Sequence, residues 1–126
     1  MNPRTGDSMN TNEELIGNTT VDPDVIITII RLAALGVPGV CRMASGPAGI
    51  DDLVKKFYSE GVKIDVEDHT VYIDLYLALF RDVDIRTTSR KVQKEVVRSM
   101  EDLVGMNVGR VDVHIEDIVI RNKETA

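Results

Sequence analysis

GVKIDVEDHTVYIDLYLALF, residues 61–80, carries the clearest β pattern of this 126-residue chain. Apolar and polar residues alternate over 62–66 and again from residue 71, with a polar turn at 67–69 between the two runs. A period of two is typical of strands, so the segment predicts a hairpin. After Asp74 the second run is apolar on both faces, which predicts that its far half is buried on both sides.

Two helices are predicted on either side of this hairpin. The first covers 22–35, where Asp22 can cap the free amides, and Gly36 is expected to end it in a left-handed conformation. The second covers 85–104, and Gly105 ends it. A final strand is predicted at 111–115, extending through Ile120.

Shorter elements complete the sequence pattern. We expect a short strand at 19–21, an extended segment at 40–43, a loop at 45–49 and a short helix at 50–58. The order of elements predicts an α+β fold: a two-layer domain with two main helices packed on one face of a three- to four-stranded mixed sheet. Residues 19–120 form this single domain, between a flexible polar N-terminal tail at 1–18 and a C-terminal tail at 121–126.

The first helix is apolar on more than one side. On a helical wheel, Ile27 and Leu35 flank the polar residues Thr28 and Arg31, where a one-sided helix would be polar. A second helix or another chain should therefore cover it in addition to the sheet. Its predicted core face is Val25, Ile26, Ile29, Ile30 and Ala33, and that of the second helix is Ile85, Val92, Val96, Met100 and Leu103.

Bulk properties narrow the functional classes. The net charge is −6, so the chain on average repels nucleic acid and anionic lipid. Cys41 is the only cysteine, which excludes an internal disulfide and favours the cytoplasm. We expect no signal peptide, and we expect no transmembrane segment because the longest apolar run, 25–40, is too short and too interrupted.

Several motifs occur in an order that resembles the alkaline shock protein family, the envelope stress response proteins of Gram-positive bacteria. The similarity covers about residues 20–120. The matching pieces are 25–34, GVPGV at 36–40, MASG at 43–46, GVKIDV at 61–66, the long strand at 71–79, VQKEV at 92–96 with Met100 and Gly105, and VDVHI at 111–115.

The resemblance implies a small cytoplasmic protein of cell-envelope homeostasis. Members of the family are non-enzymatic and self-associating, and some are held at the membrane by a partner protein. The resemblance therefore implies a homo-oligomer as the main partner, a membrane-anchored protein as a second candidate partner, and a cytoplasmic location that is peripheral to the membrane through such a partner.

The reactive side chains predict no catalytic, metal or cofactor site. His69 lies in the hairpin turn and His114 in the last strand, too few ligands for a metal centre. Cys41 has no histidine near it in sequence and is better interpreted as a small, partly buried residue. Asp74 is isolated in sequence and is interpreted as a surface charge. We therefore expect no enzyme activity and no cofactor.

Basic residues gather on the second helix. Segment 81–98 has a net charge of +3, and an outward stripe forms where its cations recur at helical spacing. One interpretation is a solvated face held by i,i+4 pairs of Lys91 with Glu95 and of Arg98 with Asp102. The other is a contact with an anionic partner. The candidate interaction residues are Ile27 and Leu35 on the first helix and Arg86, Arg90, Lys91, Lys94 and Arg98 on the second.

Two functions remain open at this stage. The first is an interaction protein of the envelope-stress type that assembles through the apolar flank of its first helix. The alternative is a nucleic-acid-binding module similar to KH domains, because Gly46 and Gly49 enclose a Gly-x-x-Gly loop and segment 81–98 is basic. The acidic balance of the chain and the lack of basic residues in the loop make nucleic acid the less favoured partner.

Overall fold

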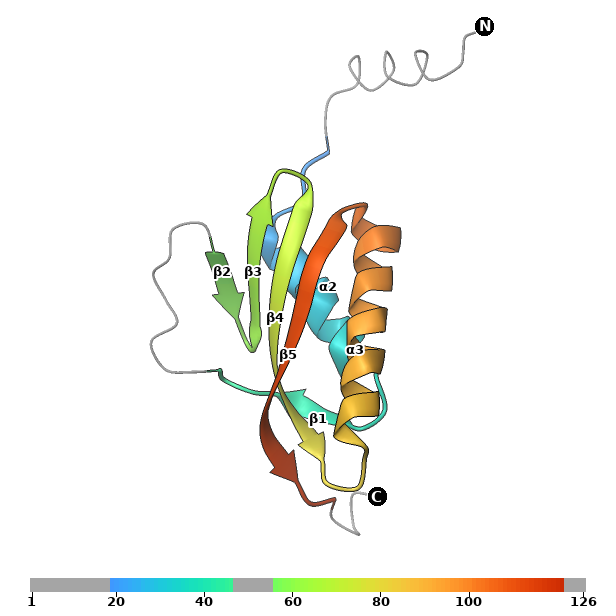
Figure 1. Ribbon diagram of the computed structural model, residues 1–126. Coiled ribbons are helices and arrows are strands. Elements are labelled where there is room, and N and C mark those ends of the chain that lie inside the picture. Colours follow the sequence, from blue (N-terminus) through green and yellow to red (C-terminus); the bar gives the residue numbers. More distant parts are fainter. Residues whose placement is uncertain (1–18, 47–55, 122–126) are drawn as a thin grey trace, which may run out of the picture.

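The long strand of the hairpin organises the sheet in the computed structural model, which describes residues 19–46 and 56–121. This strand is β4 (Thr70–Phe80). β3 (Val62–Glu67) pairs antiparallel with its first half and β1 (Val40–Met43) with its second half, and β2 (Lys56–Ser59) pairs antiparallel with β3. β5 (Asn107–Val119) runs parallel along the other edge of β4. The result is a five-stranded mixed sheet (Figure 1).

The predicted hairpin is confirmed with its register. Glu67 lies opposite Thr70 and Val62 opposite Leu75, so the turn falls at Asp68 and His69. The far half of β4 is buried on both faces, because consecutive residues from Leu75 to Leu79 are all buried. Its central position, with β3 and β1 on one edge and β5 on the other, explains this burial.

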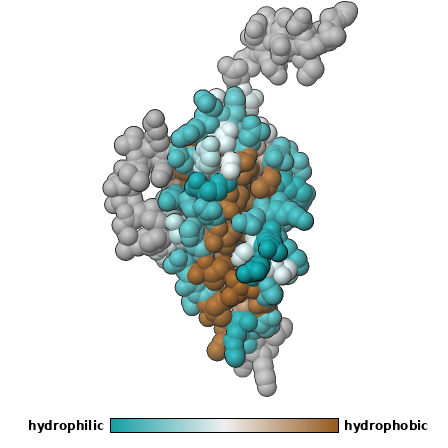
Figure 2. All heavy atoms as spheres, in the orientation of Figure 1, coloured by the Kyte–Doolittle hydropathy of each residue, from teal (hydrophilic) through white to brown (hydrophobic). Residues whose placement is uncertain are grey.

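Two helices cover one face of the sheet, which confirms the two-layer α+β architecture. α2 (Pro23–Leu35) crosses behind β4 and β5 in Figure 1, and α3 (Ile85–Ser99) lies along the β5 side. α3 continues into a π-helical turn, η1 (Met100–Val104), which ends at Gly105 in the left-handed conformation, as predicted. Figure 2 shows a band of hydrophobic residues that follows the length of the sheet, bordered by hydrophilic residues.

Carboxylates cap both helices. Asp22 Oδ1 accepts a hydrogen bond from the backbone N–H of Asp24 at 2.8 Å, so the predicted cap is confirmed. Asp84 Oδ1 accepts from the backbone N–H of Thr87 at 2.9 Å. This hydrogen bond holds the pKa of Asp84 below its ordinary value, because it stabilises the ionised carboxylate. Each carboxylate satisfies an amide that the helix itself leaves free.

Side chains from both layers form the core. Val92, Val96 and Met100 are fully buried, as predicted for the second helix. They contribute to one cluster with α2 and with the inward residues of the sheet. The buried members from those elements are Ile26, Ile27, Ile30 and Ala34 of α2 and Val62, Ile64, Val71, Ile73, Leu75, Leu77 and Leu79 of β3 and β4.

Some predicted elements differ from the structure. Residues 19–21 form no strand, because the polar segment has no neighbouring strand with which to pair. The helix predicted at 50–58 is wrong where the structure describes it, since β2 extends over Lys56–Ser59 and pairs with β3. The remainder of that prediction, 50–55, lies outside the described residues. β1 and β2 raise the strand number from the expected three or four to five.

The turn after α2 also differs from the prediction. Gly36 has a φ of −77°, so it continues the right-handed conformation of the helix. The left-handed residue is Gly39, with a φ of +102°, where an added Cβ would lie 3.0 Å from Val83 Cγ1. The chain therefore reverses three residues later than Gly36, and Pro38 lies inside the turn.

The helical-wheel prediction is wrong at the edges of both helices. Val25 is 48% exposed, whereas Ile27 is 2% exposed. α3 packs against α2 on a second side, which rotates and widens the buried arc of α2. This contact confirms that α2 is covered by more than the sheet. Ile85 and Leu103, predicted on the core face of the second helix, are 47% and 71% exposed because they lie at its ends.

The described helices are short for a bilayer. Within residues 19–46 and 56–121, none combines the length and the apolar character that crossing a membrane requires.

Candidate protein-interaction surface

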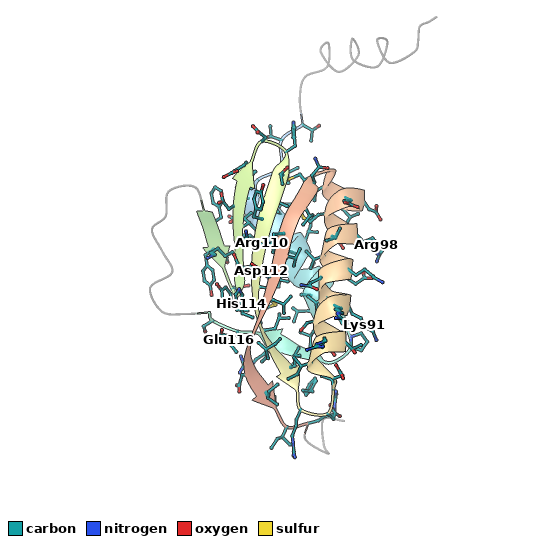
Figure 3. All side chains as sticks on the ribbon, in the orientation of Figure 1. Lys91, Arg98, Arg110, Asp112, His114 and Glu116 are labelled. Atoms are coloured by element: carbon teal, nitrogen blue, oxygen red, sulfur yellow. The ribbon has the colours of Figure 1, made fainter. Side chains whose placement is uncertain are left out.

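The cations predicted on the second helix form a continuous exposed surface. Arg86, Arg90, Lys94 and Arg98 recur every four residues along α3, and Lys91 lies beside them. All five are exposed. Figure 3 shows Lys91 and Arg98 on the side of α3 that faces away from β5. We call these five residues the basic ridge.

One acidic residue partly neutralises the basic ridge. Glu95 Oε1 accepts a hydrogen bond from Arg98 at 2.7 Å, and this contact raises the pKa of the Arg98 guanidinium. The predicted pairs Lys91 with Glu95 and Arg98 with Asp102 are wrong, because Arg98 reaches back one turn to Glu95. Within the described part of the chain, the other four cations of the ridge form no ion pair, so their charge is available to a partner.

An exposed apolar stripe runs along α2 on the side opposite its buried residues. Val25 is 48% exposed, Leu32 63% and Leu35 40%. Thr28 lies between them and is also exposed, with its hydroxyl donating to the carbonyl of Asp24 at 2.9 Å. We call these four residues the outer stripe. Exposed leucine and valine side chains in one row are typical of a surface that another protein covers.

The outer stripe retains one of the two apolar residues predicted for interaction. Leu35 is exposed as expected, whereas Ile27 belongs to the core and cannot reach a partner. Leu32 was missed, although it lies three residues before Leu35 on the same side of the helix. That spacing was the available sequence signal, but assigning it to the outside required knowing where α3 packs.

A groove joins the outer stripe to the basic ridge. It has a volume of about 360 Å³ and lies between the C-terminal end of α2 and the middle of α3. Leu32 and Pro38 contribute apolar surface on one side, and Lys91 and Glu95 contribute charge on the other. This combination can hold an apolar side chain that is followed by an acidic group, because both needs are met within one concave surface.

A polar cluster occupies the sheet face that the helices leave open. Figure 3 shows Arg110, Asp112, His114 and Glu116 along β5. Asp74 of β4 lies among them, with a side chain that is only 14% exposed. Asp74 Oδ1 is 3.0 Å from His114 Nε2, and its Oδ2 is 3.7 Å from an Arg110 nitrogen. The interpretation of Asp74 as an isolated surface charge is therefore wrong.

Aromatic side chains extend this cluster. The ring of Tyr76 stacks on His114, with 4.7 Å between ring centroids and 15° between the planes. Burial raises the pKa of the Tyr76 hydroxyl, and the negative charge of Asp74 raises it further. Lys63, Arg110 and His114 thus surround the carboxylate of Asp74. We therefore interpret the cluster as a stabilising network on the open face.

The remaining candidate residues lie apart from the two surfaces. Cys41 is half-buried in β1, and His69 is exposed in the hairpin turn. Groups of three or more metal-binding side chains do not occur in the described ranges. Of the Gly-x-x-Gly loop, only Gly46 is described, and an added Cβ there would contact the hydroxyl of Tyr58 and the ring of Tyr76.

Comparisons with known proteins show that the sequence matches a family. The model of the alkaline shock protein family matches residues 11–120, and the description of that family is a cell envelope-related function. A protein from Streptococcus pyogenes, Spy1535, is 30% identical over 107 residues, which cover 84% of this chain and 82% of that protein. YqhY from Bacillus subtilis is 26% identical over 110 residues, covering 86% and 82% of the two chains.

Solved structures show a related arrangement of elements. MamM-CTD superposes with a TM-score of 0.54 over 76% of this chain and 99% of that chain. The two sequences are 13% identical. The similarity therefore concerns the fold alone.

Proposed function

The chain belongs to the alkaline shock protein family. From this membership we propose that it serves a cell envelope-related function as a non-enzymatic, self-associating protein. It acts through protein–protein contacts made by the outer stripe of α2 and the basic ridge of α3. The carrying observation is the stripe itself, in which Leu32 is 63% exposed and Leu35 40%.

The chemistry of these surfaces supports recognition. Leucine and valine side chains gain free energy when another protein removes them from water. Arginine and lysine cations beside them favour a partner that carries carboxylates. A second copy of this chain is such a partner, because its net charge is −6 even though it includes the ridge. The same charge disfavours nucleic acid.

Size-exclusion chromatography with light scattering tests this function. We expect the wild-type protein, at micromolar concentration, to have a mass above the 14.0 kDa of one chain. The double substitution Leu32→Glu and Leu35→Glu should return it to 14.0 kDa, because it places charges in the contact. Leu103→Glu is the matched control, since Leu103 is 71% exposed but lies outside the stripe, and it should leave the assembly intact.

The second candidate partner, a membrane-anchored protein, is tested by repeating the measurement with extracted membranes. Such a protein would bind the outer stripe and the basic ridge if the chain alone did not associate. A wild-type protein that stays monomeric both alone and with the membranes contradicts the proposal.

A further inference from the structure

The residues of the outer stripe have the spacing of a helix-pairing seam. Thr28, Leu32 and Leu35 follow Val25 at three, seven and ten residues, the alternation of three and four that brings one face of a helix against another helix. The hydroxyl of Thr28 is already bonded within α2, so the residue demands no polar partner at the seam. The stripe therefore fits a helix better than it fits a strand or a loop.

The stripe is also symmetric about its centre. Val25 and Leu35 each lie five residues from Ile30, and Thr28 and Leu32 each lie two residues from it. Turning a second copy of α2 end over end about Ile30 places Val25 opposite Leu35 and Thr28 opposite Leu32. A two-fold contact requires this self-complementarity, because both copies present the same patch.

We propose that two copies of the chain pair through an antiparallel α2–α2 contact, with the two-fold axis on the outer side of α2 at the height of residue 30. This inference rests on the proposed self-association and adds its partner surface, orientation and register. The 360 Å³ groove beside Leu32 lies at the end of α2 where Val25 of the second copy arrives, so it receives that side chain.

Charge selects the antiparallel orientation. Asp22 and Asp24 are exposed at the start of α2. Lys91 and Glu95 line the groove beside its C-terminal end, and Glu95 is already paired with Arg98, which leaves the charge of Lys91 uncompensated there. An antiparallel pair brings the two carboxylates of each copy toward Lys91 of the other. A parallel pair would instead place acidic ends together and basic ends together, which like-charge repulsion disfavours.

Cysteine cross-linking tests the register. Cys41 is first replaced by Ser, and Val25→Cys and Leu35→Cys are then introduced in separate chains. Two copies of residue 25 would lie about 15 Å apart along the helix axis, whereas residue 25 of one copy would face residue 35 of the other. A disulfide requires Cα atoms within about 7 Å. Mixing the two variants under oxidation should therefore give a heterodimer, while each variant alone should remain largely uncross-linked.

The outcomes separate this inference from the proposed function. If Leu35→Cys alone cross-links to itself as readily as the mixture does, the contact is not antiparallel about Ile30 and the inference is wrong. The inference also fails if light scattering shows assembly but the mixture gives no heterodimer. If the protein is monomeric by light scattering, the proposed self-association itself has failed.

A charge exchange tests the orientation independently. Asp24→Lys should raise the dissociation constant of the dimer by about tenfold or more, because it places a cation near Lys91 of the second copy. Adding Lys91→Asp to the same chain should restore most of the affinity, since it returns opposite charges to each contact. Retention of the weakened affinity in the double variant would contradict the proposed pairing of ends.

Discussion

Tyr76 occupies an unusual position for a residue on the open face of the sheet. It is only 4% exposed, because His114 stacks on its ring and Tyr58 packs edge-on at 6.3 Å between centroids. Burial raises the pKa of its hydroxyl, and Asp74, two residues earlier on the same face, adds to the shift. The residue therefore links folding stability to alkaline pH.

The sign of this linkage follows from proton binding. Above about pH 10 an unfolded tyrosine loses its proton, while Tyr76 in the native state retains it until the pH exceeds its raised pKa. The stability contributed by the raised pKa of Tyr76 is thus fully present below about pH 10. It is lost as the pH rises from there through the pKa of the native state. Urea unfolding between neutral and alkaline pH should show a steeper loss for wild type than for Tyr76→Phe.

Tyr72→Phe is the control for this experiment. Tyr72 lies on the same strand, and its ring packs on Gly109 and under the Arg110 guanidinium, at 5.6 Å from the ring centroid. This variant should keep the alkaline slope of the wild type. Equal slopes for wild type and Tyr76→Phe would show that Tyr76 does not carry the effect.

At the scale of the element, α2 combines a buried arc with an exposed one. Ile27 belongs to the hydrophobic core, whereas the outer stripe faces solvent. Because the core cannot refill the space of a lost side chain, truncations within the buried arc are costly. Truncations at exposed positions are not, whatever their hydrophobicity.

Ile27→Ala should therefore lower the free energy of unfolding by about 2–4 kcal/mol. Leu103→Ala should change it by no more than about 0.5 kcal/mol, because Leu103 is 71% exposed. Denaturant midpoints at constant slope provide the measurement. A smaller loss for Ile27→Ala than for Leu103→Ala would contradict the packing described for the two helices.

These two residues also show where prediction from sequence ends. Alternation over 62–80 and the caps at Asp22 and Gly105 are local signals, and they predicted the hairpin, both helices and the two-layer fold correctly. α3, which packs against α2, lies more than fifty residues after Ile27 in the chain, and a helical wheel of α2 alone cannot include that contact. Long-range packing thus decided the positions that the local pattern misassigned.

The candidate surface was predictable to the same extent. The basic ridge follows from helical spacing alone, and its five residues are exposed as that spacing implies. The prediction of the apolar interaction residues was correct for one of the two, because Leu35 is exposed and Ile27 is not. The cluster around Asp74 was missed, since it forms only when β5 pairs parallel to β4 and brings His114 and Arg110 beside it.

At the scale of the whole molecule, charge and apolar surface are arranged together. The chain is acidic overall, yet the basic ridge lies beside the outer stripe and shares a groove with it. Each copy therefore offers both an apolar contact and cations to an acidic copy of itself. This arrangement gives the proposed association a dependence on salt, because screening weakens the contacts between the charged ends of α2 and the ridge.

Sedimentation equilibrium of the wild-type protein is the most direct test of self-association through α2. Over a range of protein concentrations at low salt, we expect a mass that rises toward twice the 14.0 kDa of one chain and stops there. Added salt should shift this transition to higher protein concentration. A mass that stays at 14.0 kDa at every concentration, or one that grows without limit beyond two chains, would contradict the pairing of two copies through α2.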